Sequence, residues 1–321
     1  MSLVAKFLQF ILLLVAFLPA SNLFGQTVVT FNSTTTWTCP AGVTFITVEC
    51  WGGGGAGGGA RGNPSAGGGG GGGSYVKNTN IPVVPGNTYT VTVAAPVTGT
   101  TNNGANGNDS WFNTAGTILA KGGLGGPRAN SNFQTAAGAA KLTTGNVGAE
   151  APFNYYGGAG GTGGASGAAG GGGGSSAGTG SDGNNAPGIT GGAAVTGGGA
   201  GVDGSSSSAD GPDNPNLGGG GAGGRAGSGT DRAGGNGGPG QVRITYTEYY
   251  CPASTAVAPS ATQTVCIGGS TNTLTATITM GGIVGTPTLQ YQWYYNTTNT
   301  NNIGTATLVG GATSSTFTPP S

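Results

Sequence analysis

The sequence predicts an all-β protein, a β-sandwich with a long glycine-rich insertion, and three observations lead to that class. Short segments alternate apolar and polar residues and are rich in β-branched and aromatic side chains, as half-buried strands are. Helical periodicity is absent beyond the N-terminal segment. Glycine supplies 74 of 321 residues, far above ordinary usage.

The first expected strands lie in the N-terminal half of the chain. In the segment 44–51, Ile46, Val48 and Cys50 fall on one face and Thr47 and Glu49 on the other, which predicts a half-buried antiparallel strand. Turn signals such as Pro85-Gly86 separate the segments. The expected strands are 27–32, 44–51, 74–77, 87–93 and 117–121.

Glycine is concentrated in two windows. Residues 52–73 and 124–240 hold 57 of the 74 glycines, and an alternating strand, 241–247, follows the second window. A returning strand favours an insertion within one sandwich, because a linker between two finished domains would not need it. We therefore expect a domain over 27–249, with an insertion at 124–240 and a closing strand at 241–247.

Two interpretations of the glycine tract stay open. The irregular glycine spacing excludes collagen, which needs glycine at every third position. A disordered linker is the simpler interpretation and agrees with the scarcity of apolar residues. Packed extended helices of the polyglycine II type, with three residues per turn, are the alternative, because bare backbones can approach closely. Strands of one sheet system flank the tract on both sides, and this favours the ordered, polyglycine II-like insertion. Sparse anchors would pin such helices to the sandwich: Phe133, Phe153, Tyr155, Tyr156, Ile189, Val195 and Leu217.

The N-terminus predicts a secretory signal peptide over 1–26. Lys6 precedes a short apolar stretch, Pro19 and small residues, and the stretch is shorter than the roughly 20 residues that span a bilayer. We expect a secreted or cell-surface protein whose mature chain does not insert into the membrane. In such a chain cysteines are disulfide-bonded or buried. Cys39 and Cys50 are a candidate disulfide, with two buried thiols as the alternative. We expect the partner of Cys266 in the part of its domain that does not follow in this sequence; Cys251 either bridges to Cys266 or stays unpaired.

Composition argues against an enzyme. The chain has no histidine, which removes the usual catalytic triads, histidine zinc sites and an ordinary general base. Glycine-rich phosphate motifs occur by chance in this composition, so no cofactor is expected. With 9 basic residues against 9 acidic ones we expect no basic patch and no nucleic-acid partner. No metal site is expected either, and these loop aspartates are interpreted as solvated rather than calcium-binding: Asp182, Asp203, Asp210 and Asp213.

Four stretches carry a family resemblance: TTTWTCPAGVTFITVECWGGGGAGGG, GGGGSYVKNTNIPVVPGNTYTVTV, GNDSWFNTAGTILAKGGLGG and GGNGGPGQVRITY. In this order they resemble the glycine-rich domain of exported bacterial surface proteins and phage tail-fibre adhesin tips. In the phage relatives, polyglycine helices hold variable receptor-binding loops. The resemblance covers roughly 27–247 and implies an adhesive or displayed role, but it assigns no binding residue, because the loops are the variable part.

The segment 250–321 resembles the immunoglobulin-like repeats of secreted Bacteroidetes proteins. Cys266 on an early strand and Trp293 on a later one match the core pairing of that sandwich. The last strands do not follow, so we expect a partial domain from a longer protein, in which a type IX secretion sorting domain would follow.

We therefore expect an exported, non-enzymatic protein that acts in adhesion or display through loops. Its partner would be a surface glycan or a protein receptor. A carbohydrate-binding module of a larger secreted enzyme is the alternative, and an ice-binding protein is a third hypothesis. Aromatic side chains that would contact a sugar are Trp111, Phe112, Tyr155 and Tyr156.

Overall fold

The structure is a computed structural model of the 321-residue chain. It describes residues 11–13, 26–227, 229–247, 274–275, 293–295, 307–314 and 316–318. The chain divides into two compact units, one of residues 26–247 and one of residues 1–25 with 248–321. Among the described residues, no helix has the length and apolar character needed to cross a bilayer.

The unit 26–247 contains a β-sandwich of two antiparallel sheets, which confirms the predicted class. One sheet has the order β11-β6-β4-β13-β2 and the other the order β3-β7-β8-β9. Turns lie where the sequence predicts them; for example, Gly86 adopts φ +81° beside Pro85, a conformation that favours glycine. The strands are β2 (Gln26–Phe31), β3 (Thr35–Thr38), β4 (Phe45–Trp51), β6 (Tyr75–Pro82), β7 (Thr88–Thr92), β8 (Ser110–Phe112), β9 (Ile118–Ala120), β11 (Asn154–Tyr155) and β13 (Gln241–Thr247).

The main hydrophobic core lies between these two sheets. Ile46, Val48 and Cys50 of β4 enter it, as the alternation in the sequence predicts. Trp37 of β3 packs against Phe112 of β8, with ring centroids 6.2 Å apart. Because both sheets contribute inward-facing residues, burial of these side chains holds the sandwich together.

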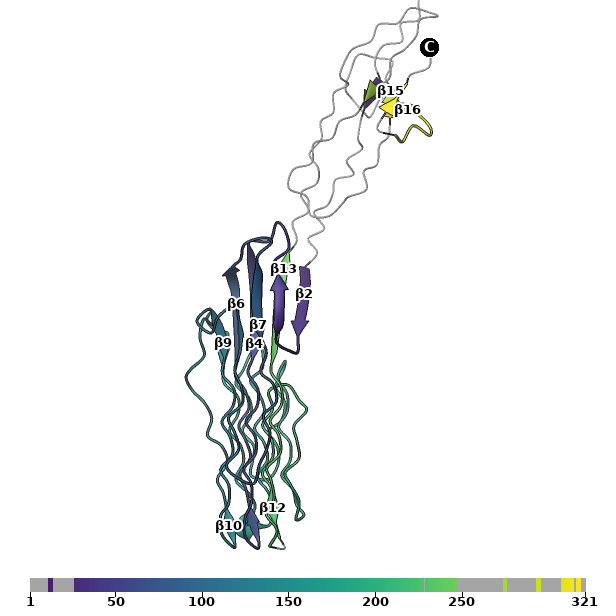
Figure 1. The fold of residues 1–321 in the computed structure, drawn as a ribbon. Helices are drawn as coiled ribbons and strands as arrows, with labels where there is room; N and C mark the ends of the chain where they lie inside the picture. Colours follow the sequence, from purple (N-terminus) through teal and green to yellow (C-terminus); the bar gives the residue numbers. More distant parts are fainter. Residues whose placement is uncertain are drawn as a thin grey trace, which may run out of the picture. The chain divides into compact units, whose positions relative to one another are not determined.

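The predicted closing strand takes an interior place in its sheet. β13 lies between β2 and β4 and pairs antiparallel with both. Gln26 faces Thr247 in that register, so the two ends of the unit leave side by side. Figure 1 shows these ends at one extremity of the unit and β10 (Gln134–Thr135) and β12 (Arg225–Ala226) at the other.

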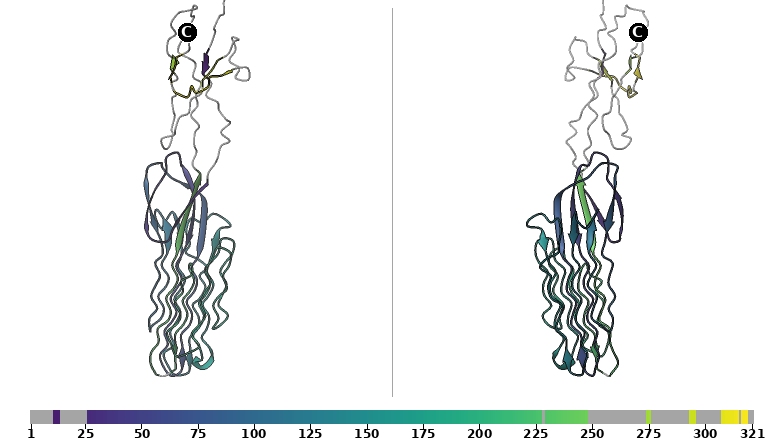
Figure 2. Two further views of the ribbon diagram at one scale, coloured as in Figure 1. Left: turned by 90° about the vertical axis from the view of Figure 1, so that its right-hand side faces the viewer. Right: turned by 60° about the vertical axis from the view of Figure 1, so that its left-hand side comes forward.

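Extended chain segments continue from the sandwich as a bundle of side-by-side, nearly parallel or antiparallel runs (Figures 1 and 2). This glycine bundle consists of residues 52–74, 94–109 and 121–240, apart from β11, which pairs with β6 of the sandwich. The insertion is therefore larger than the predicted 124–240, because two earlier connections of the sandwich join it. At its far end β5 (Ser65–Ala66) pairs with β10 and β12, beside a single 3-10 turn, η1 (Ala165–Gly167).

The segment 52–60 shows how the bundle is held together. Its N–H groups donate to three neighbouring segments in strict rotation, at N···O distances of 2.8 to 3.0 Å. Gly52, Gly55 and Gly58 donate to residues 68–74, the residues after them to 102–108, and the next ones to 232–238. A repeat after every third residue is that of an extended helix with three residues per turn. The tract is therefore an ordered polyglycine II-type assembly, not the disordered linker.

The segment 66–74 lies at the centre of this assembly. It donates hydrogen bonds to residues 121–127, 158–161 and 218–224 and accepts them from residues 52–58, 136–139 and 171–177. Six neighbours around one extended helix satisfy its backbone polar groups in a region that water does not reach.

Close packing is the reason that these positions are glycine. A Cβ built on Gly57 would overlap the carbonyl of Ala222, and one on Gly68 would overlap the carbonyl of Ala137. Buried alanines such as Ala56 occur between the glycines. Gly57 and Gly68 are therefore glycine because a side chain has no space there. Neither residue has the positive φ that would by itself favour glycine.

The second unit is described only in short pieces. β1 (Ile11–Leu13), within the predicted signal peptide, pairs with β15 (Trp293–Tyr295), which also pairs with β16 (Thr307–Leu308). β14 (Leu274–Thr275) pairs with β17 (Thr316–Phe317). Trp293 is buried against Phe317, while Cys251 and Cys266 lie outside the described residues. The signal peptide and the immunoglobulin-like domain stay predictions.

Candidate functional site: the tip of the glycine bundle

The four aromatic residues proposed to contact a sugar do not form one surface. Phe112 is 1% exposed and belongs to the sandwich core, so it is not available to a ligand. Trp111 is half-buried on the opposite face of β8. Tyr155 lies on β11 in the other sheet, where its ring stacks on Tyr75 at 6.3 Å.

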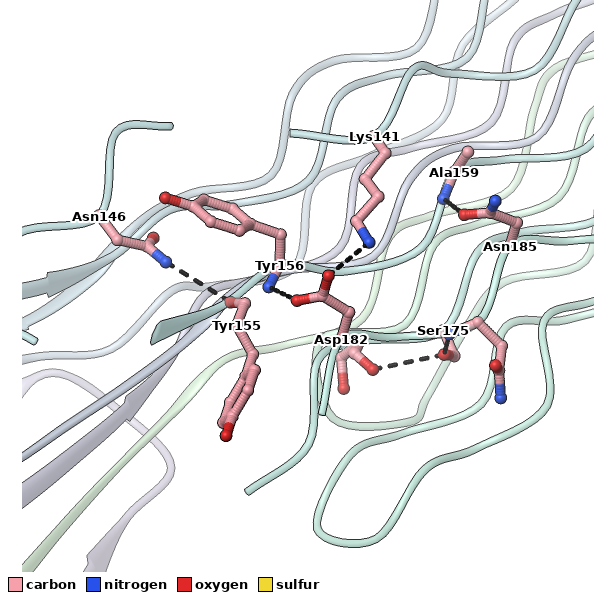
Figure 3. Close-up of polar contacts among 10 residues, drawn as sticks. Lys141, Asn146, Tyr155, Tyr156, Ala159, Ser175, Asp182 and Asn185 are labelled. Atoms are coloured by element: carbon pink, nitrogen blue, oxygen red, sulfur yellow. Dashed lines mark hydrogen bonds and ion pairs between the residues drawn. The ribbon is translucent and has the colours of Figure 1, made fainter. Parts of the chain in front are cut away.

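Tyr155 and Tyr156 instead belong to the junction between sandwich and bundle (Figure 3). The N–H of Tyr156 donates to Asp182 Oδ1 at 2.8 Å, and Lys141 forms an ion pair with Asp182 Oδ2 at 2.7 Å. The Asp182 carboxylate is thus occupied by a backbone donor and a lysine.

The other loop aspartates have the same structural use. Asn and Asp side chains along the outer runs accept hydrogen bonds from backbone N–H groups, where no further glycine run lies outside to accept them. The pairs are Asn103 with Arg128, Asn106 with Gly125, Asp109 with Gly122, Asp182 with Tyr156, Asn185 with Ala159, Asp203 with Gly191, Asp210 with Ala233 and Asp213 with Asn236. We call these pairs the Asx ladder. Within the part of the chain that the structure describes, no group of three or more potential ligands is placed to hold a metal.

Cys39 and Cys50 do not form the candidate disulfide; both are buried free thiols. The Cys39 Sγ lies 3.3 Å from the carbonyl oxygen of Val43, just before β4 begins. Cys50 is near the other end of that strand, seven residues beyond Val43 and so about 23 Å further along at the usual rise per residue, and a disulfide needs Cα atoms within about 7 Å. Burial raises the pKa of both thiols, which disfavours the reactive thiolate.

Glu49 is the one buried carboxylate of the described sandwich, although the alternation placed it on an exposed face. Arg243 binds it through two nitrogens, each at 2.7 Å, and the Tyr75 hydroxyl donates to it at 2.8 Å. Burial raises its pKa, but the hydrogen bonds from Arg243 and Tyr75 and the charges of Arg243 and Lys77 outweigh burial and hold the pKa below its ordinary value. Both oxygens of the Glu49 carboxylate are occupied by Arg243 and Tyr75, so Glu49 has a structural role and is not a candidate general acid or base.

Trp51 explains why a strand runs directly into polyglycine. Its ring packs with Tyr75, 4.8 Å away, in a second core outside the sandwich, and its Nε1 donates to the carbonyl of Gly197. Three of the predicted anchors, Phe153, Tyr155 and Leu217, pack against this core. The aromatic at the end of β4 thus fastens the bundle to the sheet.

Charged side chains gather at the far end of the bundle, which we call the tip: residues 60–66, 101–103, 128–135, 164–169, 205–210, 225–227 and 229–232. Backbone hydrogen bonds place Ala60 against Arg232, Arg61 against Ala129 and Gly59 against Asn102. Four of the five arginines in the sequence are here: Arg61, Arg128, Arg225 and Arg232. Composition alone does not predict this gathering of arginines, because the fold assembles residues that are far apart in sequence.

Phe133 is also at the tip and corrects a prediction. It was expected to anchor the bundle, yet it is 68% exposed. Its φ is +58°, a left-handed conformation that is unusual for a bulky residue. Its N–H donates to the carbonyl of Pro64, which places it beside the turn that follows Arg61. Ile189, at 43% exposed, is likewise not an anchor.

The fold and this arrangement define a class: a β-sandwich whose connections extend into a polyglycine bundle that ends in loops. The chain belongs to the glycine-rich domain family, whose model matches residues 29–247. A search of curated proteins gives no match to the chain.

Sequence reasoning missed the tip and the Asx ladder. The ladder has a signal in the sequence, since Asn103, Asn106 and Asp109 recur at intervals of three, the period of the extended helix. The tip arginines have no such signal, because Arg128 lies 67 residues after Arg61 and Arg225 lies 97 residues after Arg128, and only the fold of the runs brings them together.

Proposed function

We propose that this protein is an exported surface protein that displays the tip for adhesion and has no catalytic role. The observation that carries the proposal is the position of the tip. The two chain ends of the unit, Gln26 and Thr247, leave side by side at the extremity opposite to the tip (Figure 1). Attachment through these ends leaves the tip free to reach a partner.

The construction of the bundle supports the same function. Backbone hydrogen bonds join its runs to one another, and the glycine-rich runs have few side chains that could move. The bundle is therefore suited to hold loops at a fixed distance from the sandwich. Binding residues are commonly placed on loops that a rigid scaffold positions. The partner is a surface glycan or a protein receptor, and the predicted signal peptide supports export.

The test measures binding of the purified chain to bacterial and animal cells and to a glycan array. Phe133→Ala removes the exposed aromatic of the tip; Val84→Ala is the matched control, because Val84 is 56% exposed in the turn that follows β6 on the sandwich. We expect the wild-type chain to bind and Phe133→Ala to weaken binding at least fivefold, about 1 kcal/mol, with Val84→Ala unchanged. No binding to any probe, or equal binding by both variants, would contradict display by the tip.

A further inference from the structure

The tip carries an excess of positive charge that its own acids do not neutralise. Arg61 forms an ion pair with Asp231 at 3.2 Å, and this is the only carboxylate that the described residues pair with Arg61, Arg128 or Arg232. Arg225 differs from these three, because it donates to the carbonyls of Gly167 and Ser206 and so holds the loops.

The arginines are held close to one another by a neutral group. Arg61 and Arg128 both donate to Oδ1 of Asn102, at 3.3 and 2.9 Å. Two like charges on one amide oxygen repel each other, and an anion placed between them would offset that repulsion.

Two guanidinium nitrogens also lack hydrogen-bond partners. Nε of Arg232 is buried without one, and Nε of Arg61 faces Asp231 outside hydrogen-bond geometry. Ala60 faces Arg232 in an antiparallel bridge, so Asp231 faces Arg61 in the same register. Both Nε atoms are buried, so an external anion would meet the terminal nitrogens instead. Arg61 and Arg128 each carry more N–H donors than the bonds to Thr101 and Asn102 use, and guanidinium groups bind carboxylate and sulfate oxygens through such donors.

We propose that Arg61 and Arg128 bind an acidic polysaccharide, one that bears carboxylate or sulfate groups. The exposed ring of Phe133 near this cluster offers an apolar face to a sugar ring. A nucleic acid is disfavoured, because proteins that bind single strands stack successive bases on several aromatic side chains, and Phe133 is the one aromatic residue of the described tip. The inference rests on the proposed function and names the ligand class of the same tip.

The experiment immobilises the full chain and measures binding of four probes by interferometry: polygalacturonate, dextran sulfate, neutral dextran and single-stranded DNA. Arg128→Gln and Arg61→Gln/Arg128→Gln test the cluster. Lys141→Gln is the control, because it removes one positive charge from the bundle away from the tip. Thermal unfolding of each variant checks that the fold is kept.

We expect one or both acidic polysaccharides to bind and neutral dextran not to bind. Arg128→Gln should weaken binding about fivefold and the double variant at least tenfold, with Lys141→Gln unchanged and binding falling as salt is raised. The inference is overturned if DNA binds as tightly as the polysaccharides, if neutral dextran binds equally, or if the arginine variants bind like wild type. Binding of cells that depends on Phe133 but not on the arginines would overturn the ligand class and leave the display function intact. Failure of every probe, cells included, would overturn both.

Discussion

At Gly70 the bundle leaves no room for a methyl group. A Cβ there would overlap the carbonyls of Gly55 and Ala56, and backbone atoms on several sides cannot withdraw. Gly70→Ala should therefore destabilise the unit by about 1–3 kcal/mol or more, as overpacking does.

Chemical denaturation of Gly70→Ala measures this cost. The matched control is Gly180→Ala, where a Cβ meets no atom within 4 Å and φ is not positive. For Gly180→Ala we expect no loss of stability. Alanine has fewer conformations than glycine in the unfolded chain, so the substitution slightly favours the folded state. Equal stabilities of the two variants would show that Gly70 is not closely packed.

We expect the free energy of unfolding to depend on pH through the Glu49 carboxylate. Its pKa in the fold is below the ordinary value of 4.5, so its contribution is present above that value and is lost as the pH falls through the folded pKa. Stability should therefore decrease in acid below about pH 4.5, partly because of this residue.

The measurement compares the free energy of unfolding of wild type and Glu49→Gln across that pH range. At neutral pH the variant should be less stable by about 1–3 kcal/mol, because Arg243 and Tyr75 lose a charged acceptor. The difference should shrink as the pH falls. A difference that stays constant with pH would contradict the assigned role.

At the scale of single elements, the side chains of the Asx ladder accept backbone hydrogen bonds along the outer runs. Asn106 Oδ1 accepts a hydrogen bond from the N–H of Gly125 at 2.9 Å, in place of a carbonyl from a further run. Asn106→Ala removes the acceptor, and we expect a loss of about 0.5–1.5 kcal/mol. Asn106→Asp keeps an oxygen acceptor and should stay close to wild type.

Hydrogen exchange of the Gly125 amide in the same two variants gives the local readout. It should accelerate in Asn106→Ala and change little in Asn106→Asp. If alanine leaves both exchange and stability unchanged, the side chain does not stand in for a neighbouring run.

The strands could be predicted because their side chains carry a pattern. The segments expected at 27–32, 44–51 and 241–247 coincide closely with β2, β4 and β13, where alternation and β-branching are strong. β3 and β8 were not among the expected strands. The neighbours of each glycine run could not be predicted, since a segment without side chains carries no apolar face that selects a partner.

The candidate site could be predicted even less. Arg61, Arg128 and the pair Arg225 and Arg232 come from three separate turns, so their proximity depends on the register of runs that the sequence leaves undefined. Phe133 was expected to be an anchor because apolar residues are usually buried, yet its place in a tip turn exposes it.

At the scale of the whole unit, the sandwich supplies the hydrophobic core and the bundle supplies length. The two share strands β4 and β6, because residues 52–74 connect them and form the central runs. Trp51 and Tyr75 lie at the two points of transition and pack together. The pairing of β4 with β6 therefore holds the two ends of the connection 52–74 side by side where the bundle begins.

The central claim is that the glycine tract is an ordered, hydrogen-bonded bundle, and amide hydrogen exchange by mass spectrometry on the full chain tests it most directly. We predict strong protection in residues 66–74, 170–177 and 218–224, comparable with that of β4 and β13, because their N–H groups donate to neighbouring runs. Exchange of these segments at the rate of an unfolded chain, with the strands protected, would contradict the bundle and the display of the tip that depends on it.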